Sequence, residues 1–241
     1  MPHFQHLSTT FLRVGRHRIS DLVESIVRYC PKHGRMLSSR QSAAFTRYRT
    51  KVIYDLDNRG KYQYGDIILA YFKLFDELFF QGRLGSICKL KFEHQRPGDA
   101  SLLGHTDILI TSDCGNGHYK LKHCNILLFD RKHDYRRPRE RLLDCLGTLL
   151  HEMCHAFIGI WGCTDTMCKT KIENRGKRGH GFAWQDIAYS VERACRDPGF
   201  LGLSLDLGRW QSLEKELKVS GATHPIDLGR WGFPPRNRYE K

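Results

Sequence analysis

The chain has 241 residues with 39 Lys or Arg and 26 Asp or Glu, so its net charge is +13. This length fits one domain with extensions, and no run of about 18 apolar residues exists that would predict a membrane span. The charge favours a polyanionic partner such as nucleic acid, with a merely soluble basic protein as the plainer alternative. Nine cysteines form an odd set without framework spacing, which favours reduced thiols in a nuclear or cytoplasmic compartment.

Residues 1–61 are expected to form a basic, partly disordered N-terminal arm. Residues 1–60 hold eleven Lys or Arg against four Asp or Glu, a balance of +7. Asp21 to Tyr29 predicts a short helix, and the polar, Ser-rich stretch that follows as far as Arg49 predicts a flexible segment. Such an arm can follow a phosphate backbone or serve only as a solvated linker. The arginines of the first 20 residues, without an acid, also resemble a mitochondrial transit peptide, which is the less favoured localisation.

A folded domain is expected over residues 62–197 and begins with a helix near Tyr64. Asp66 is the predicted N-cap, and Gly82 and Gly85 are expected to end the helix. One broad face carries Ile67, Ile68, Tyr71, Leu74, Phe75, Leu78 and Phe79. A face so continuously apolar should be buried in the core.

Three short strands are predicted next, at Ser86–Glu93, Asp107–Thr111 and Asn125–Asp130. Antiparallel pairing into a small sheet is the simplest arrangement. One strand edge is expected to hold a substrate in extended form through main-chain hydrogen bonds, although the sequence does not say which. Four histidines are expected in surface loops and not as metal ligands: His105, His118, His123 and His133.

The stretch from His151 to His155 places two histidines four residues apart, with Glu152 directly after the first. On a helix this spacing turns about 400°, so both imidazoles project from the same side, about 6 Å apart along the axis. Two ring nitrogens so placed can converge on one zinc ion, and Glu152 beside them can accept a proton from water. This is the His-Glu-x-x-His pattern of zinc metallopeptidases. Two surface histidines on an amphipathic helix are the alternative.

The surrounding sequence predicts that this motif lies in a long buried helix beginning at Pro138. Helical spacing relates Leu142, Leu143, Leu146, Leu149, Leu150, Met153, Cys154 and Phe157. Cys145 and Cys154 lie on this apolar face and are expected in the core. A charged Glu152 in such a helix would be costly without a metal or a partner nearby.

A catalytic zinc needs a third protein ligand, and His180 in Gly179-His180-Gly181 is the best candidate. The flanking glycines let the backbone approach the site, and an apolar-periodic segment follows. Residues of the intervening loop compete as ligands: Cys163, Asp165, Cys168 and Glu173. Cys163 and Cys168 are alternatively a small metal clip, a disulfide or two ordinary thiols.

Three segments together resemble the SprT-like family, which includes the Spartan proteases. They are Phe75 to Leu84, Leu149 to Phe157 and Gly179 to Trp184, and the resemblance covers residues 62–197. It implies a zincin-like minimal metallopeptidase domain of α+β class, with the motif helix packed on a second helix and a small antiparallel sheet. It also implies Zn2+ on His151, His155 and His180, Glu152 as catalytic base, and DNA-bound or DNA-crosslinked proteins as substrates. No Cys-x-x-Cys pair is present, so the zinc ribbon of several members is missing.

Two further features leave the function open. The loop 169–178 is basic and should lie at the mouth of the cleft, where it can bring DNA to the site or select acidic peptides. The extension 198–241, after the turn at Asp197-Pro198-Gly199, repeats Asp-Leu-Gly-Arg-Trp at Asp206 and Asp227. Its tryptophans can anchor a partner or pack onto the domain. The alternatives are therefore a zinc endopeptidase, a nucleic-acid-binding protein with a structural zinc, and an organellar peptidase whose charge is incidental. The oligomeric state is not readable.

Overall fold

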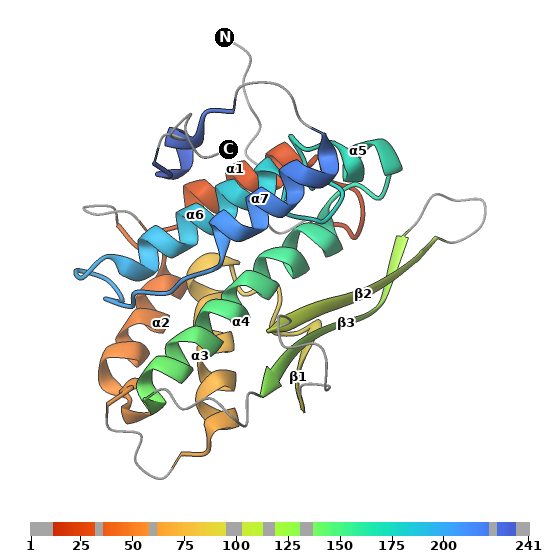
Figure 1. Cartoon of the computed structure of the whole chain (residues 1–241). Helices are drawn as coiled ribbons and strands as arrows, with labels where there is room; N and C mark the ends of the chain where they lie inside the picture. Colours follow the sequence, from red (N-terminus) through yellow and green to blue (C-terminus); the bar gives the residue numbers. More distant parts are fainter. Residues whose placement is uncertain are drawn as a thin grey trace.

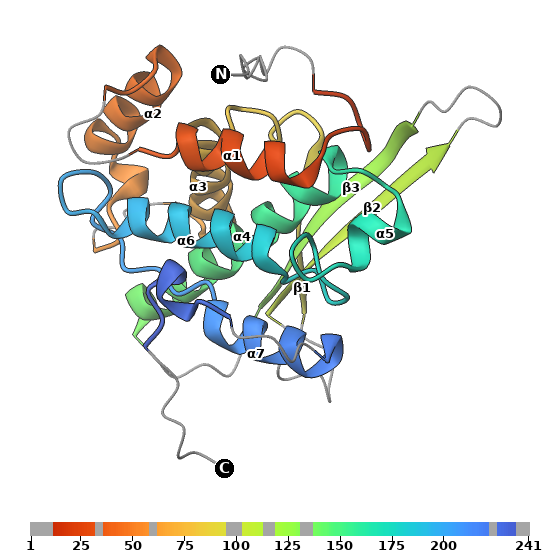
Figure 2. The same cartoon turned by 90° about the horizontal axis from the view of Figure 1, so that it is seen from above.

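The computed structural model describes residues 12–31, 36–57, 62–94, 103–112, 119–130, 137–221 and 226–234. Within these residues a small sheet lies along one side of a group of helices (Figures 1 and 2). The elements are α1 (Ile19–Tyr29), α2 (Ser39–Thr50), η2 (Val52–Tyr54), α3 (Tyr64–Phe79), β1 (Cys88–His94), β2 (Gly104–Ser112), β3 (Tyr119–Asp130), α4 (Pro138–Trp161), α5 (Thr166–Thr170), α6 (Phe182–Arg196), α7 (Arg209–Ser220) and η3 (Leu228–Trp231).

The predicted motif helix is α4, which begins at Pro138 as expected. Glu140 accepts a hydrogen bond from the main-chain N–H of Arg137 at 3.2 Å, which satisfies a donor that the helix start leaves open. In Figure 1, α4 runs through the middle of the molecule, with the sheet on one side and α6 and α7 on the other. Its contacts are with α1, α3, α6, β2 and β3. Because it is enclosed in this way, nearly every predicted apolar position is buried, Cys154 included, while Leu143 and Cys145 are half-buried.

The sheet is mixed, so the prediction of a purely antiparallel sheet is wrong. The strand order is β1-β3-β2, in which β2 pairs antiparallel with β3 and β1 pairs parallel with β3. The prediction assumed that each strand pairs with the next in sequence. Here β1 lies beside β3, and the two reversals of the chain between them restore the direction. The result that matters for the site is that β2 is an edge strand, adjacent to α4.

The histidines expected in loops are placed differently. His105 and His123 lie on β2 and β3, where His123 contacts the carboxylate of Asp107 at 2.9 Å. Both are accessible to solvent, as expected, and neither belongs to the group that His151, His155 and His180 form. His118 and His133 lie outside the described residues.

The helix predicted near Tyr64 is α3, and Gln63, not Asp66, is its N-cap. Asp66 lies in the first turn, where its negative charge interacts favourably with the positive end of the helix dipole. After Phe80 the backbone takes positive φ at Gln81 (62°) and Gly82 (70°), which ends the helix where the glycines predicted.

Residues 39–50 were expected to be flexible, but they form α2. Ser38 and Gln41 make a capping box, in which the main-chain N–H of each is accepted by the side chain of the other. The Gln41 side chain is buried and donates to the carbonyls of Tyr29 at 2.8 Å and Leu78 at 2.9 Å. It thereby ties α2 to the ends of α1 and α3. The polar composition concealed this helix, although the spacing Ser-x-x-Gln was a readable start signal.

The C-terminal extension packs onto the domain. Asp197 starts the predicted turn by accepting the N–H of Phe200 at 3.0 Å. The chain then returns to the core, with alternate residues buried: Leu201, Leu203, Leu205 and Leu207. Trp231 is fully buried against Phe182 and donates from Nε1 to Asp186 at 2.9 Å. Both alternatives for the repeat were open, and for Trp231 the structure favours packing onto the domain.

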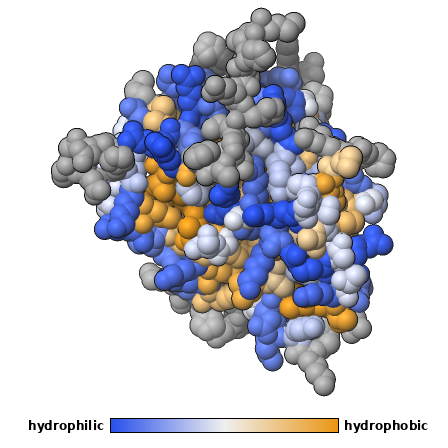
Figure 3. Space-filling model, turned by 180° about the vertical axis from the view of Figure 1, so that it is seen from behind, coloured by the Kyte–Doolittle hydropathy of each residue, from blue (hydrophilic) through white to orange (hydrophobic). Residues whose placement is uncertain are grey.

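No described helix is both long and apolar enough to cross a bilayer. Exposed apolar side chains nevertheless include Leu69, Phe92 and Leu109. On the face opposite to that of Figure 1, apolar residues gather into a patch between hydrophilic ones (Figure 3).

Candidate metal centre

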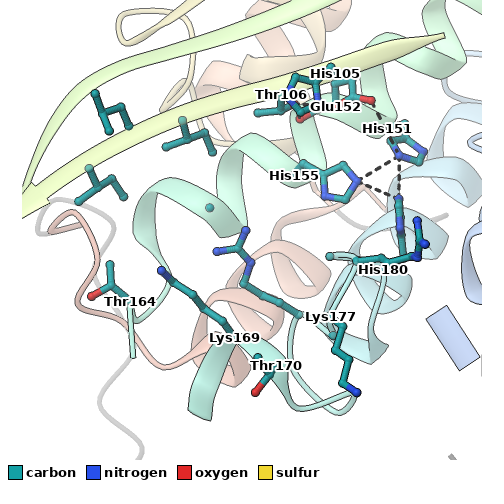
Figure 4. Close-up of a pocket in the computed structure, with 18 of the residues that line it drawn as sticks. His105, Thr106, His151, Glu152, His155, Thr164, Lys169, Thr170, Lys177 and His180 are labelled. Atoms are coloured by element: carbon teal, nitrogen blue, oxygen red, sulfur yellow. Dashed lines mark hydrogen bonds and ion pairs between the residues drawn. The ribbon is translucent and has the colours of Figure 1, made fainter. Parts of the chain in front are cut away.

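Three histidines converge at one point beside α4 (Figure 4). The Nε2 atom of His155 lies 3.1 Å from that of His151 and 3.0 Å from that of His180, and the third side of this triangle is 3.1 Å. Ligands of a tetrahedral ion with bonds of about 2.0–2.1 Å lie about 3.3–3.4 Å apart. The observed triangle is a few tenths of an ångström tighter, so these side chains can hold a metal ion with little movement.

Hydrogen bonding does not account for this convergence. The Nδ1 atom of His151 lies 2.8 Å from the carbonyl oxygen of Leu207, which can only accept, so Nδ1 carries the proton. The Nε2 atom of a neutral His151 therefore presents a lone pair toward the other two rings. Three nitrogens that face one another cannot form three hydrogen bonds, whereas a shared cation satisfies all three lone pairs.

The histidines are also held in the state that binds metal. Burial lowers the pKa of His151 to about 4 and that of His180 to about 3. Burial, followed by the charges of the other two histidines, lowers the pKa of His155 well below its usual value. At neutral pH the imidazoles are therefore uncharged, as metal ligation requires.

Trp184 packs against all three histidine rings. The indole is fully buried, and its centroid lies 4.6 Å from that of the His151 ring, 5.5 Å from that of His155 and 4.9 Å from that of His180. One rigid aromatic surface thus contacts the three rings and limits their rotation.

Glu152 lies beside the three histidines without belonging to the group. Its side chain is 8% exposed, and Oε1 lies 4.0 Å from Nε2 of His151. Thr106 of β2 donates its hydroxyl proton to Oε2 at 2.7 Å, which sets the direction of the carboxylate. Burial raises the pKa of Glu152 to about 7, while the Thr106 hydrogen bond acts against that rise. A carboxylate so placed can exchange a proton with water at neutral pH.

His180 comes from a loop folded tightly against α4. Gly179 has a φ of 85°, and a Cβ atom there would lie 3.3 Å from Cε1 of His155, so both its conformation and its closeness favour glycine. The N–H of Gly181 donates to the carbonyl of Arg175 at 2.7 Å, and α6 begins directly afterwards. The glycines on either side of His180 thus act as the sequence predicted.

The competing ligands are not brought to the site. Among the described residues only His151, His155 and His180 form a group able to hold a metal. Cys163, Asp165, Cys168 and Glu173 lie outside it, and both cysteines are free thiols.

The metal-ligand group lies at one end of a cleft of about 900 Å³. One wall is the edge strand β2, and the opposite wall is the basic loop, which contributes Lys169, Arg175, Lys177 and Arg178. The basic loop therefore lies at the cleft, as predicted. Among the described residues β2 pairs only with β3, so the main-chain groups of its other edge are open to the cleft.

Sequence reasoning missed three contributors to the site: Thr106, Leu207 and Glu216. The carboxylate of Glu216 accepts the main-chain N–H of His180 at 3.1 Å. Thr106 lies in β2, which begins at Gly104, whereas the predicted strand begins at Asp107, the residue after Thr106. The alternation of leucines from 201 to 207 was a readable sign of a buried extended segment. No sequence signal marks Glu216, which is one of two glutamates in the polar helix α7.

Comparison of the chain with protein-family models, with curated proteins and with solved structures finds no match.

Proposed function

We propose that this chain is a zinc-dependent metalloendopeptidase of the SprT-like type. The observation that carries the proposal is the convergence of the three Nε2 atoms, 3.0–3.1 Å apart, next to the buried carboxylate of Glu152 in an open cleft. A purely structural zinc site is closed by a fourth side chain. No fourth side chain joins the group among the described residues, which supports a catalytic site over a structural one.

The chain's own residues then have distinct parts in the reaction. His151, His155 and His180 would hold the ion. Zinc bound there would polarise a scissile carbonyl and make water acidic near neutral pH. Glu152 takes a proton from the attacking water and later delivers one to the leaving amine. The hydroxyl of Thr106 keeps the carboxylate directed at the site.

Edge strand β2 is the element best placed to hold the substrate. An extended peptide laid along it would add a further strand and pass beside Glu152. The basic residues on the other wall are compatible with substrates that arrive with DNA. Together with the sequence resemblance, they support DNA-bound or DNA-crosslinked proteins as the substrate class.

The second candidate is a nucleic-acid-binding protein whose metal is structural. The observation in its favour is the basic loop, because four cations line one cleft. It differs from the first candidate in one respect that can be tested: it gives Glu152 no part in function.

The deciding experiment uses zinc-loaded wild type and Glu152→Gln, with zinc content measured for both. Each is incubated with a basic DNA-binding protein, with and without single-stranded DNA, and cleavage of substrate and self-cleavage are followed. We expect cleavage by the wild type that rises with DNA and is lost in the variant. Glu152-dependent cleavage that ignores DNA would keep the peptidase and remove the DNA-linked substrate. If both proteins hold one zinc and neither cuts, the structural-zinc candidate replaces the peptidase.

A further inference from the structure

The segment after the predicted end of the domain runs directly beside the metal centre. A Cβ atom built on Gly147 of α4 would lie 2.4 Å from the carbonyl oxygen of Asp206. The main chain near residue 206 therefore lies against the helix that carries His151 and His155. This segment and α7, the helix after it, each form a hydrogen bond to one of the three histidines.

Leu207 connects the segment to the first ligand. Its carbonyl accepts the Nδ1–H of His151 at 2.8 Å, and its N–H donates to Oε1 of Glu192 at 3.2 Å. Glu192, on α6, is also paired with Arg209 through bonds of 2.8 and 2.6 Å. This largely buried pair fixes the peptide that orients His151.

Glu216 of α7 connects the next part of the extension to the third ligand. Its side chain is fully buried, and its carboxylate accepts the main-chain N–H of His180 at 3.1 Å and that of Arg178 at 3.0 Å. A Cβ atom on Gly176 would lie 2.5–2.8 Å from the same carboxyl group, so the loop bends closely around it.

His180 depends on this anchor more than the other ligands do. His151 and His155 are fixed by the regular backbone of α4, whereas His180 precedes α6, whose N-cap Gly181 has no side chain to hold the loop. The Nδ1 atom of His180 is buried and has no hydrogen-bond partner among the described residues. No second hydrogen bond to the ring therefore fixes its direction, which depends on packing against Trp184 and on the position of the main chain.

The negative charge of Glu216 also favours a metal ion at His180. The hydrogen-bond donors to Glu216 among the described residues are main-chain amides, and none of the ion pairs found there includes it. A buried carboxylate without a paired cation is costly, and a divalent ion held by His180 would offset part of that cost.

We propose that Glu216 is a positioning residue of the metal centre, which holds the main chain of His180 so that its Nε2 meets those of His151 and His155. The C-terminal segment 203–216 is therefore part of the site and not an appendage to it. This inference rests on the metal site of the proposed function and deepens it.

The test compares the full chain with Glu216→Ala, Glu216→Gln and the control Glu214→Gln. Glu214 lies on the same helix, and its side chain is 41% exposed and pairs only weakly with Lys218, at 3.7 Å. Zinc affinity is measured by competition with a chromophoric chelator, ligand geometry by the visible spectrum of the cobalt-loaded protein, and folding by circular dichroism of the metal-free protein.

We expect Glu216→Ala to lower zinc affinity by about 10–100-fold and to change the cobalt spectrum, as loss of an outer-shell partner does. Glu216→Gln keeps the packing and one acceptor oxygen, so its zinc affinity should lie between those of Glu216→Ala and wild type. This variant carries the test if Glu216→Ala does not fold. Glu214→Gln should match wild type. Wild-type zinc affinity and cobalt spectrum in folded Glu216 variants would overturn this inference alone. A wild type that binds zinc without cutting would overturn only the peptidase, and one that binds no zinc would overturn both.

Discussion

Gly147 offers a test of the contact between α4 and the C-terminal segment, because two opposite effects meet at this position. Replacing a glycine inside a helix by alanine stabilises the helix by about 0.8–1.0 kcal/mol. The new Cβ atom, however, would lie 2.4 Å from the carbonyl oxygen of Asp206, and contacts below 3.0 Å force a shift. The neighbour must therefore move by at least 0.6 Å (3.0 minus 2.4 Å), and it is backbone, which cannot rotate away.

Overpacking of this kind costs about 1–3 kcal/mol, so the clash should outweigh the gain in helix propensity. We expect Gly147→Ala to lower the free energy of unfolding by about 1 kcal/mol, which corresponds to a Tm lower by about 2–4 °C for a chain of this size. Because the shift also displaces the carbonyl of Leu207 from His151, zinc affinity should fall by about ten-fold. Urea unfolding of the metal-free protein and chelator competition measure the two effects separately.

Gly159 provides the matched control on the same helix. A Cβ atom there would also meet an atom at 2.4 Å, but that atom is Cδ1 of Ile108, the end of a side chain that can rotate. Gly159→Ala should therefore be neutral or stabilising by up to about 1 kcal/mol. If Gly147→Ala is as stable as Gly159→Ala and binds zinc like wild type, the segment at Asp206 does not pack against α4 in solution, and the reasoning fails.

Three further predictions test other parts of the molecule. Trp231→Ala should lower the free energy of unfolding by about 3–5 kcal/mol in urea titrations, because a fully buried indole is lost. Trp231→Phe keeps one aromatic ring but loses the bond to Asp186 and part of the buried volume, so it should cost less, about 1–3 kcal/mol. An Ala variant as stable as the Phe variant would contradict the burial. Burial raises the pKa of Asp76 to about 6, above its value in the unfolded chain, so the folded protein binds a proton more tightly. Lowering the pH from 7 to 5 should therefore stabilise the wild type by about 1 kcal/mol relative to Asp76→Asn. Parallel profiles of unfolding free energy against pH for the two proteins would refute this. Thr106→Val should lower kcat/KM for peptide cleavage by about ten-fold, because Glu152 loses its charge-assisted hydrogen bond. Thr106→Ser keeps the hydroxyl and should stay near wild type. Equal activity of the Val and Ser variants would show that the hydroxyl is not needed.

The sequence by itself determined the elements whose signals are local. The spacing of His151 and His155, the proline at 138 and the helical recurrence of apolar residues were enough to place α4 and to bury Glu152. The glycines around His180 marked the third histidine because a close backbone approach needs them. In each case the property depends on a few adjacent residues, so it can be read along the chain.

Only the tertiary structure decided which distant residues support these side chains. The parallel pairing of β1 with β3 places β2 at the edge, which no pattern within a single strand encodes. Leu207 acts through its carbonyl, which every residue possesses, and Glu216 acts because α7 lies across the loop at His180. Main-chain acceptors and buried charges of this kind leave no mark in the sequence, since their role comes from what the fold brings next to them and not from the residue type.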